Sequence, residues 1–304
     1  MRIVIIGFGN MGKRHYKVLQ KLLNVGDKIA LCDPNPNSET GVETYSDYHD
    51  IVDADAVIIA TPPSTHYQIA KYFLSQSIPV LVEKPICTNE REARDLVKLA
   101  FDKNVPFLVG HTERFNPVLR KAKELISYNL IGDIMTVTTR RIGLYPKQIK
   151  DVDVVLDIGI HDVDIVHYLV GTEHKNVRVA KRSIYFKDRA DFVSIFMEYA
   201  NVMAMCQASW ISSVKIRDLT VVGKTGILTA DLINQEVKVI QNVVHFDGSG
   251  NPEFSGNSET SFKSTGVEPL AEELKHFISM VADGRSEDQQ YAIDALKICL
   301  KDSD

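Results

Sequence analysis

The sequence predicts a two-domain α/β protein, with a doubly wound parallel sheet in the first part and antiparallel strands in the second. Up to residue 117, short apolar runs alternate with helical segments, which is typical of parallel strands joined by right-handed crossovers. Beyond that point, strand-like segments follow one another through tight links. The chain has 304 residues, 44% of them hydrophobic, and can therefore bury two cores. We expect domains at 1–117 and 118–304.

The first domain should contain five strands, because its Val/Ile/Leu runs are continuous, as in strands buried on both faces. They are expected at 2–6, 28–32, 56–60, 79–82 and 105–109. Helices are expected at 13–23, 66–75 and 90–102. Thr65 with Gln68, and Asn89 with Glu92, have the spacing of capping boxes at the starts of the last two.

The second domain should mix a few helices with many strands. Helices are expected at 118–127, around 161–170 and around 270–281. Strands are expected at 133–143, 176–186, 192–199, 202–210, 216–222, 227–231 and 237–241. The links Ala200-Asn201 and Gly223-Lys-Thr-Gly226 indicate antiparallel neighbours. The polar segment 246–266, rich in Ser, Gly and Asn, is predicted to be a loop.

Composition excludes several classes of protein. A formal charge of -5 gives no basic footprint for nucleic acid or for a membrane surface. The four cysteines have no metal-ligand spacing, so we expect buried core thiols in a reducing compartment and no metal site. No stretch approaches the ~20 apolar residues of a membrane span. We therefore expect a cytoplasmic protein.

A glycine-rich loop directly follows the first expected strand. In Gly7-Phe8-Gly9-Asn10-Met11-Gly12, the first glycine permits a tight turn, the second lets the backbone approach a pyrophosphate, and the third allows close helix packing. Asp33 ends the second strand, where a carboxylate can accept both ribose hydroxyls of NAD and would repel the 2′-phosphate of NADP. The loop and Asp33 predict an NAD site; the alternative for Asp33 is a plain turn residue.

Two further strand ends in the first domain carry candidate site residues. Thr61, Pro62 and His66 follow the third strand, as cofactor contacts or as ordinary turn and helix-start residues. Glu83-Lys84-Pro85 follows the next strand, where a turn, which the proline allows to be cis, could aim Lys84 at a substrate oxygen beside the nicotinamide. A surface lysine at a turn is the alternative.

Asp157 and His161 are the candidates for proton transfer. Residues four apart lie on one face of a helix, and an imidazole has a pKa suited to removing a hydroxyl proton. A capping Asp and a core His are the alternative for such a pair. Asp162 and Asp164 are expected to be capping and surface acids.

Polar and aromatic residues near the expected domain junction are candidates for substrate binding. They include Arg114 and Asn116 in the run 111–117. A solvated loop is the alternative for this run.

Taken together, the glycine loop, Asp33, Glu83-Lys84-Pro85 and Asp157…His161 resemble the Gfo/Idh/MocA oxidoreductases. Ala60-Thr61-Pro62, the Gly223–Gly226 turn and the helix start Glu268-Pro269-Leu270 extend the resemblance over nearly the whole chain. It implies a Rossmann domain, an open, mainly antiparallel C-terminal sheet that commonly serves oligomerisation, and catalysis by Lys84, Asp157 and His161, with Lys84 and Glu83 also at the cofactor.

The resemblance leaves the substrate open. The segments at 111–117 and 140–146 resemble the branch that oxidises the C3 hydroxyl of UDP-N-acetylglucosamine, while other members act on free sugars or inositols. In that branch Arg114, Arg140 and Arg141 would donate to the diphosphate, and Arg141 and Tyr145 would contact the substrate. Solvated arginines are the alternative. A homodimer or homotetramer through the C-terminal sheet is expected. A catalytically silent NAD-binding sensor, or an enzyme that recycles bound cofactor, are the alternatives.

Overall fold

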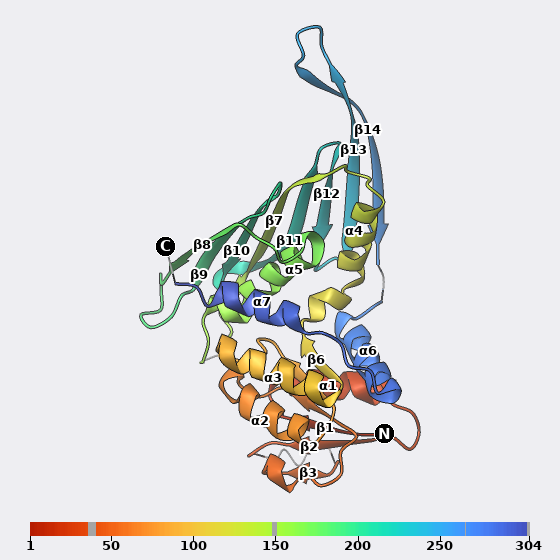
Figure 1. Ribbon diagram of the computed structural model, residues 1–304, viewed down its shortest axis with the longest axis vertical. Coiled ribbons are helices and arrows are strands. Elements are labelled where there is room, and N and C mark those ends of the chain that lie inside the picture. The colour runs from red at the N-terminus through yellow and green to blue at the C-terminus, as the bar shows by residue number, and fades with distance from the viewer. Residues whose placement is uncertain (36–40, 148–150, 265, 303–304) are drawn as a thin grey trace. The chain divides into compact units, whose positions relative to one another are not determined.

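The computed structural model describes residues 1–35, 41–147, 151–264 and 266–302 (Figure 1). Two compact units make up the chain. The first contains Met1–Thr112 and Glu268–Leu300, and the second contains Glu113–Val267 and the residues from Lys301. Within the described ranges, no helix is both long and apolar enough to cross a membrane.

The first unit is built on a six-stranded sheet with the order β3-β2-β1-β4-β5-β6, in which every pair of neighbours is parallel. The strands are β1 (Arg2–Ile6), β2 (Lys28–Cys32), β3 (Thr44–Tyr45), β4 (Ala56–Ile59), β5 (Val80–Glu83) and β6 (Phe107–Gly110). The helices joining them include α1 (Asn10–Leu22), α2 (Pro63–Ser75) and α3 (Glu90–Lys103). This confirms the predicted doubly wound sheet, whose strand order reverses between β1 and β4 and so places ligands at that point.

Helix starts confirm one predicted cap and correct the other. Asn89 caps α3, and its side chain accepts the N–H of Glu92. The capping box at Thr65 is wrong, because α2 already begins at Pro63. Proline suits a first helical turn since that position needs no N–H partner. The Thr65 hydroxyl donates to the carbonyl of Pro62 instead.

Two C-terminal helices, α6 (Pro269–Asp283) and α7 (Gln290–Cys299), belong to the first unit. This differs from the expected assignment of 118–304 to one domain. The reason is packing: α6 lies against α1, and α7 lies against α3. The buried stripe of α6 that this requires includes Leu270, Leu274 and Phe277.

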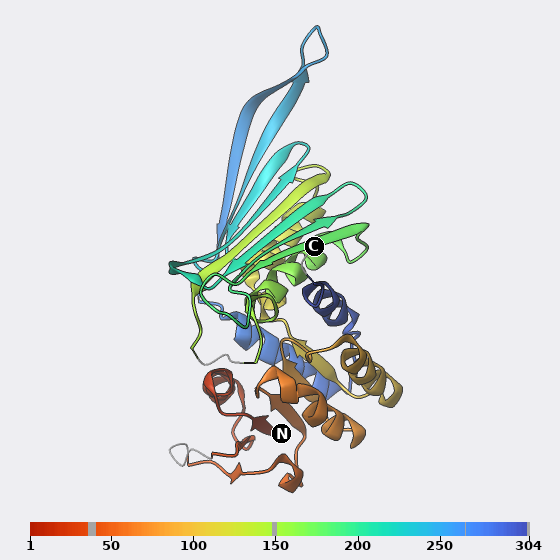
Figure 2. The same ribbon diagram turned by 90° about the vertical axis from the view of Figure 1, so that its left-hand side faces the viewer.

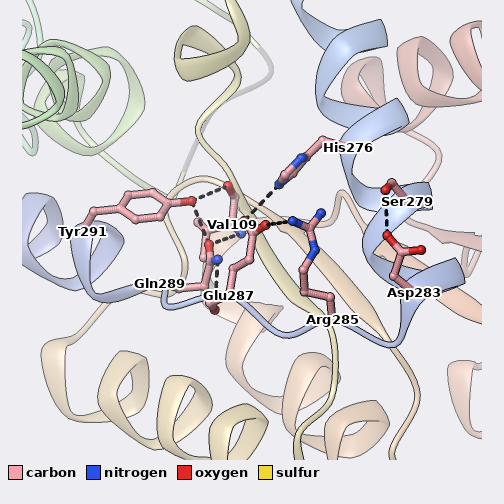
Figure 3. Close-up of polar contacts among 8 residues, drawn as sticks. All are labelled: Val109, His276, Ser279, Asp283, Arg285, Glu287, Gln289 and Tyr291. Carbon is pink, nitrogen blue, oxygen red and sulfur yellow. Dashed lines mark hydrogen bonds and ion pairs between the residues drawn. The ribbon is translucent and has the colours of Figure 1, made fainter.

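The segment between α6 and α7 also closes the edge of the parallel sheet (Figure 3). The side-chain oxygen of Gln289 accepts the N–H of Val109 on β6 at 3.0 Å, and the Tyr291 hydroxyl donates to the same oxygen at 2.7 Å. Glu287 is held in turn by His276 at 2.9 Å and Arg285 at 3.3 Å. An edge N–H is thus paired within the unit rather than left to another chain.

The second unit is built on an eight-stranded sheet with the order β14-β13-β12-β11-β7-β10-β9-β8. Its strands are β7 (Ile134–Leu144), β8 (Asn176–Arg182), β9 (Phe192–Glu198), β10 (Met203–Ser209), β11 (Ile211–Gly223), β12 (Gly226–Asp231), β13 (Glu236–Phe246) and β14 (Pro252–Lys263). Among the strands that the structure describes in this sheet, only β7 and β10 pair in parallel. The predicted antiparallel links between β9 and β10 and between β11 and β12 are confirmed.

One face of this sheet is covered by α4 (Pro117–Ser127) and α5 (Ile160–Val170). Alternation along the strands buries Val137, Ile195 and Cys206 on that face. On the other face Phe196, Met203 and Met205 are exposed in the single chain. The expected burial of all four cysteines is confirmed.

The predicted loop at 246–266 is wrong over most of its length. Residues 252–263 form β14, whose pairing with β13 runs from Glu236↔Lys263 to Phe246↔Pro252. The polar composition led to the wrong prediction of a loop, because an edge strand exposes most of its side chains and needs little apolar surface. β12 pairs with β13 only as far as Gln241, so the outer half of the β13–β14 hairpin projects beyond its neighbours (Figures 1 and 2).

Candidate active site

The glycine loop joins β1 to α1 in the form that a dinucleotide requires. Gly7 has φ +90°, and a Cβ there would lie 2.8 Å from the backbone of Ala60. A Cβ on Gly12 would lie 2.0 Å from the carbonyl oxygen of Gly7, whereas one on Gly9 would meet nothing within 4 Å. The first and third glycines thus permit close packing, and the second leaves open space where a phosphate can approach.

The N-terminus of α1 fits an anionic group. Its cap, Gly9, has no side chain to accept a hydrogen bond, and its first turn carries no acid. Asn10 is exposed there and Met11 is half-buried. The unpaired N–H groups and the positive end of the helix dipole are therefore available to a pyrophosphate.

Asp33 lies beside this loop. One of its carboxylate oxygens accepts the N–H of Phe8 at 2.7 Å, and the other accepts the N–H of Asn35 at 2.9 Å. Each oxygen keeps a further lone pair for a ribose hydroxyl. The loop and Asp33 together fit a bound NAD.

His66 does not have the expected position of a cofactor contact. Its side chain is fully buried, with Nδ1 2.8 Å from the carbonyl oxygen of Pro85 and Nε2 2.9 Å from that of Thr61. The ring therefore ties the end of β4 to the turn that carries Lys84, which corrects its predicted role. Thr61 and Pro62 lie at the carboxyl end of β4, next to the glycine loop.

Lys84 follows β5 and is half-buried, and its bond to Pro85 is cis, as the sequence allowed. Glu83 is turned inward instead of toward a cofactor: it is 5% exposed, and its Oε1 lies 2.7 Å from Nε2 of His15 on α1. Burial alone would raise the pKa of Glu83, but His15 and the charge of Lys84 hold it below its usual value. The predicted cofactor contact of Glu83 is thus corrected to a link between α1 and the Lys84 turn.

Sequence reasoning missed Glu273 and His15. Glu273 on α6 is fully buried and accepts the hydroxyl of Thr112 at 3.2 Å. Burial and the neighbouring Glu83 raise the pKa of Glu273 well above its usual value. His15 lies three residues after Gly12, on the buried stripe of α1. This spacing was a sequence signal for His15, and no comparable signal in the sequence pointed to Glu273.

In the second unit, Asp157 and His161 lie on one short segment. Asp157 is in a π-helical turn, Val155–Gly159, and His161 is in the first turn of α5. Asp157 is 7% exposed and accepts the indole N–H of Trp210 at 3.1 Å, while His161 is half-buried. Tyr145 is half-buried, with its ring centroid 5.5 Å from that of Trp210.

Arg141 and Asn116 belong to a buried ionic cluster rather than to a substrate surface. Arg141 is 3% exposed; its Nη1 donates to Glu113 at 2.9 Å and its Nε to Asp162 at 3.1 Å. The Asn116 side chain caps α4 through Val118 and donates to Glu113 at 3.0 Å. A guanidinium already paired with two carboxylates has no surplus charge for a diphosphate, so the expected roles of both residues are corrected.

Arg114 is held by Asp164 in the same way, through bonds of 2.6 to 2.9 Å. Asp162 and Asp164 are 2% and 1% exposed, which contradicts their prediction as capping and surface acids. Burial raises the pKa of Asp162 to about 6 against the opposing effect of Arg141. Arg140 is exposed and paired with Asp218 across the strands.

Comparison with known proteins decides the family. Residues 1–111 match the model described as "Oxidoreductase family, NAD-binding Rossmann fold", and residues 119–229 match the "GFO/IDH/MocA C-terminal domain". The chain belongs to the Gfo/Idh/MocA oxidoreductases. This is a family of NAD-dependent dehydrogenases that act on CH–OH groups.

Among its Gfo/Idh/MocA relatives, UDP-N-acetylglucosamine 3-dehydrogenase from Acidithiobacillus ferrooxidans is 24% identical over 290 residues, 94% of this chain and 90% of the relative. The NAD-dependent scyllo-inositol 2-dehydrogenase of Bacillus subtilis is 30% identical over 191 residues, 58% of this chain and 56% of the relative.

Two solved structures share the fold. A structure of the Acidithiobacillus ferrooxidans enzyme has a TM-score of 0.84 at 22% identity, covering 99% of this chain and 95% of the other. Levoglucosan dehydrogenase in complex with NADH and levoglucosan has a TM-score of 0.81 at 20% identity, covering 99% and 94%. The Gfo/Idh/MocA architecture thus extends over both units of this chain.

Proposed function

We propose that this protein oxidises a secondary hydroxyl of a sugar-like ring with NAD, using Lys84, Asp157 and His161. The observation that carries the proposal is that Lys84 follows β5 at the same carboxyl edge of the sheet as the glycine loop. Ligands of open parallel sheets bind at that edge. In this proposal the first unit binds NAD and the second contributes the proton-transfer pair and the substrate contacts.

Each residue has a separate task in this proposal. The N–H groups around Gly9, Asn10 and Met11 hold the pyrophosphate, and Asp33 binds the ribose hydroxyls, which favours NAD over NADP because a 2′-phosphate would meet a carboxylate. Bound NAD supplies the hydride acceptor. Lys84 donates a hydrogen bond to the reacting oxygen, and His161 takes the hydroxyl proton while Asp157 orients it.

For the substrate, we propose first the C3 hydroxyl of a UDP-N-acetylhexosamine. Support comes from the relative named UDP-N-acetylglucosamine 3-dehydrogenase, because the match covers 94% of this chain. Tyr145, half-buried beside the Trp210 ring, is the proposed ring contact.

A free sugar or an inositol is the second candidate, and a specific observation favours it. Arg114 and Arg141, the expected diphosphate donors, are neutralised by Asp164, Asp162 and Glu113. A diphosphate would therefore need other cations, whereas a neutral polyol would not. Relatives named inositol 2-dehydrogenase are compatible with this choice.

We also propose a homodimer or homotetramer through the open sheet face. Phe196, Met203 and Met205 are exposed there in the single chain, and adjoining apolar side chains on a free sheet face favour association. Analytical ultracentrifugation of the purified chain would give the number of subunits.

The test is NADH formation by the purified chain, followed by absorbance with NAD or NADP. Substrates are UDP-N-acetylglucosamine, other UDP-sugars, glucose, levoglucosan and myo-inositol. Lys84→Ala and His161→Ala should each lower kcat by ~10²–10⁴. Lys98→Ala and His49→Ala, on exposed side chains, are the matched controls. NAD binding without turnover of any substrate would instead favour a sensor or a cofactor-recycling enzyme.

A further inference from the structure

The carboxylate of Asp157 has a dedicated hydrogen-bond donor on a different element. Trp210 stands between β10 and β11, is 3% exposed, and its Nε1 lies 3.1 Å from Oδ2 of Asp157. An indole N–H can only donate. In this hydrogen bond, Trp210 is therefore always the donor and the Asp157 carboxylate is always the acceptor.

The Trp210 ring is fixed from several sides. Its backbone N–H donates to the carbonyl oxygen of Asp191 at 3.0 Å. The rings of Tyr145 and Phe186 meet it edge-on, with centroids at 5.5 and 6.5 Å, and lie 4.5 Å from one another. Such aromatic contacts restrict the ring plane and hence the direction of the N–H.

The segment that carries Phe186 is itself anchored by a buried acid. Asp191 is fully buried, and its carboxylate accepts the N–H groups of Ile184 and Tyr185, the closer at 2.6 Å. A tryptophan that only filled apolar space would not require its neighbouring Phe186 to lie on a segment fixed by hydrogen bonds. This construction specifies where the indole N–H points.

We propose that Trp210 is a positioning residue, which holds the Asp157 carboxylate in the single orientation that the reaction uses. The inference rests on the proposed role of Asp157 in catalysis. An N–H···O hydrogen bond weakens steeply when it is bent, so the fixed indole N–H favours one rotamer of the nearly buried Asp157 side chain. If the ring served only as packing, removing its N–H while keeping an aromatic ring would leave turnover unchanged.

The kinetic test is Trp210→Phe, measured on the substrate that the parent oxidises. We expect kcat to fall by about 10- to 100-fold. KM for NAD should be unchanged, because the glycine loop and Asp33 belong to the first unit. In an Asp157→Asn background the same change should have almost no further effect. Trp210→His, which restores a ring N–H, should recover part of the loss. Phe101→Leu, at an exposed position of α3, is the control.

A second measurement needs no activity. Trp210 is the only tryptophan of the sequence, so 15N-labelled tryptophan gives one indole N–H resonance. We expect this proton to exchange slowly with deuterium in the parent, and to shift and exchange faster in Asp157→Ala. If Trp210→Phe does not fold, this measurement still tests the hydrogen bond between Trp210 and Asp157.

The two failures can be told apart. If the parent oxidises no substrate, the proposed function fails, and the indole resonance still tests the contact. If the parent is active but Trp210→Phe keeps its kcat, or loses as much with Asn at position 157, the positioning role is overturned. An indole resonance that is unchanged in Asp157→Ala overturns it as well.

Discussion

At the residue scale, the first unit contains two buried glutamates whose pKa values are shifted in opposite directions. Glu83 is paired with His15 and has a lowered pKa, whereas Glu273 has a raised pKa. Two buried carboxylates close together do not both ionise at little cost. Burial and the nearby Glu83 therefore favour the neutral form of Glu273 and raise its pKa.

The first prediction concerns Glu273→Gln. The native pKa of Glu273 lies above its usual 4.5, so its contribution to stability is fully present below that pH and is lost as the pH rises toward the native pKa. Glutamine cannot ionise and keeps an acceptor for Thr112. At pH 8 the variant should be more stable than the parent by on the order of 1 kcal/mol, and at pH 4 the two should be equal. Thermal unfolding at both values measures this; a variant that is less stable at pH 8 would contradict it.

The second prediction concerns Asp162→Asn in the second unit. Its pKa rises from 3.8 to about 6 on folding, so the parent should lose stability as the pH rises from about 4 to about 6. Asparagine still accepts a hydrogen bond from Arg141 and does not titrate. The variant should therefore lack this fall in the free energy of unfolding, which in the parent is on the order of 1–3 kcal/mol. Chemical denaturation across this pH range measures the difference. Asp218→Asn, in an exposed pair with Arg140, should change the pH profile little.

Residue roles were the least predictable from sequence. Arg114 and Arg141 had the composition of an anion site, but their acids, Asp164 and Asp162, come from α5. Only the fold brings those charges together. His66 was correctly placed near the start of a helix, yet the sequence could not show that both ring nitrogens meet backbone carbonyls.

At the element scale, the β1–α1 junction separates two kinds of glycine. Gly12 packs against Gly7, and Gly9 faces open space. We predict that Gly12→Ala destabilises the first unit, because its methyl group would have to displace the backbone. Gly9→Ala should unfold at the parent's temperature and yet bind NAD at least tenfold more weakly, because the methyl group occupies the space that a phosphate approaches. Calorimetric titration with NAD, together with thermal unfolding, distinguishes the effects of the two substitutions. If Gly9→Ala binds NAD as tightly as the parent, the glycine loop does not hold the phosphates as proposed.

Elements were predicted well where periodicity was strong. The five buried strands of the first domain and the antiparallel links of the second were confirmed, since continuous and alternating apolar runs report burial directly. The two-residue strand β3 is too short to leave a pattern. β14 was missed because the described side chains of this edge strand are exposed, so they leave no alternating apolar pattern.

At the scale of the whole molecule, the first unit depends on residues 268–300. Leu270, Leu274 and Phe277 of α6 are fully or almost fully buried, and each apolar side chain of this size stabilises by roughly 1.5–3 kcal/mol. We predict that a chain ending at residue 267 loses NAD binding and unfolds its first unit at a lower temperature. Differential scanning calorimetry would show this, with the calorimetric transition of the second unit retained. NAD binding at the parent's affinity by the shortened chain would contradict it.

The closing of β6 by Gln289 and Tyr291 has a consequence for the order of synthesis. Domains are usually completed in the order in which they leave the ribosome. Here residues 113–267 form a nearly continuous unit, while the nucleotide-binding unit lacks its edge contacts and two helices until residues 268–300 emerge. The part of the chain that is made first is therefore the part that is finished last, and during translation its parallel sheet is open along β6.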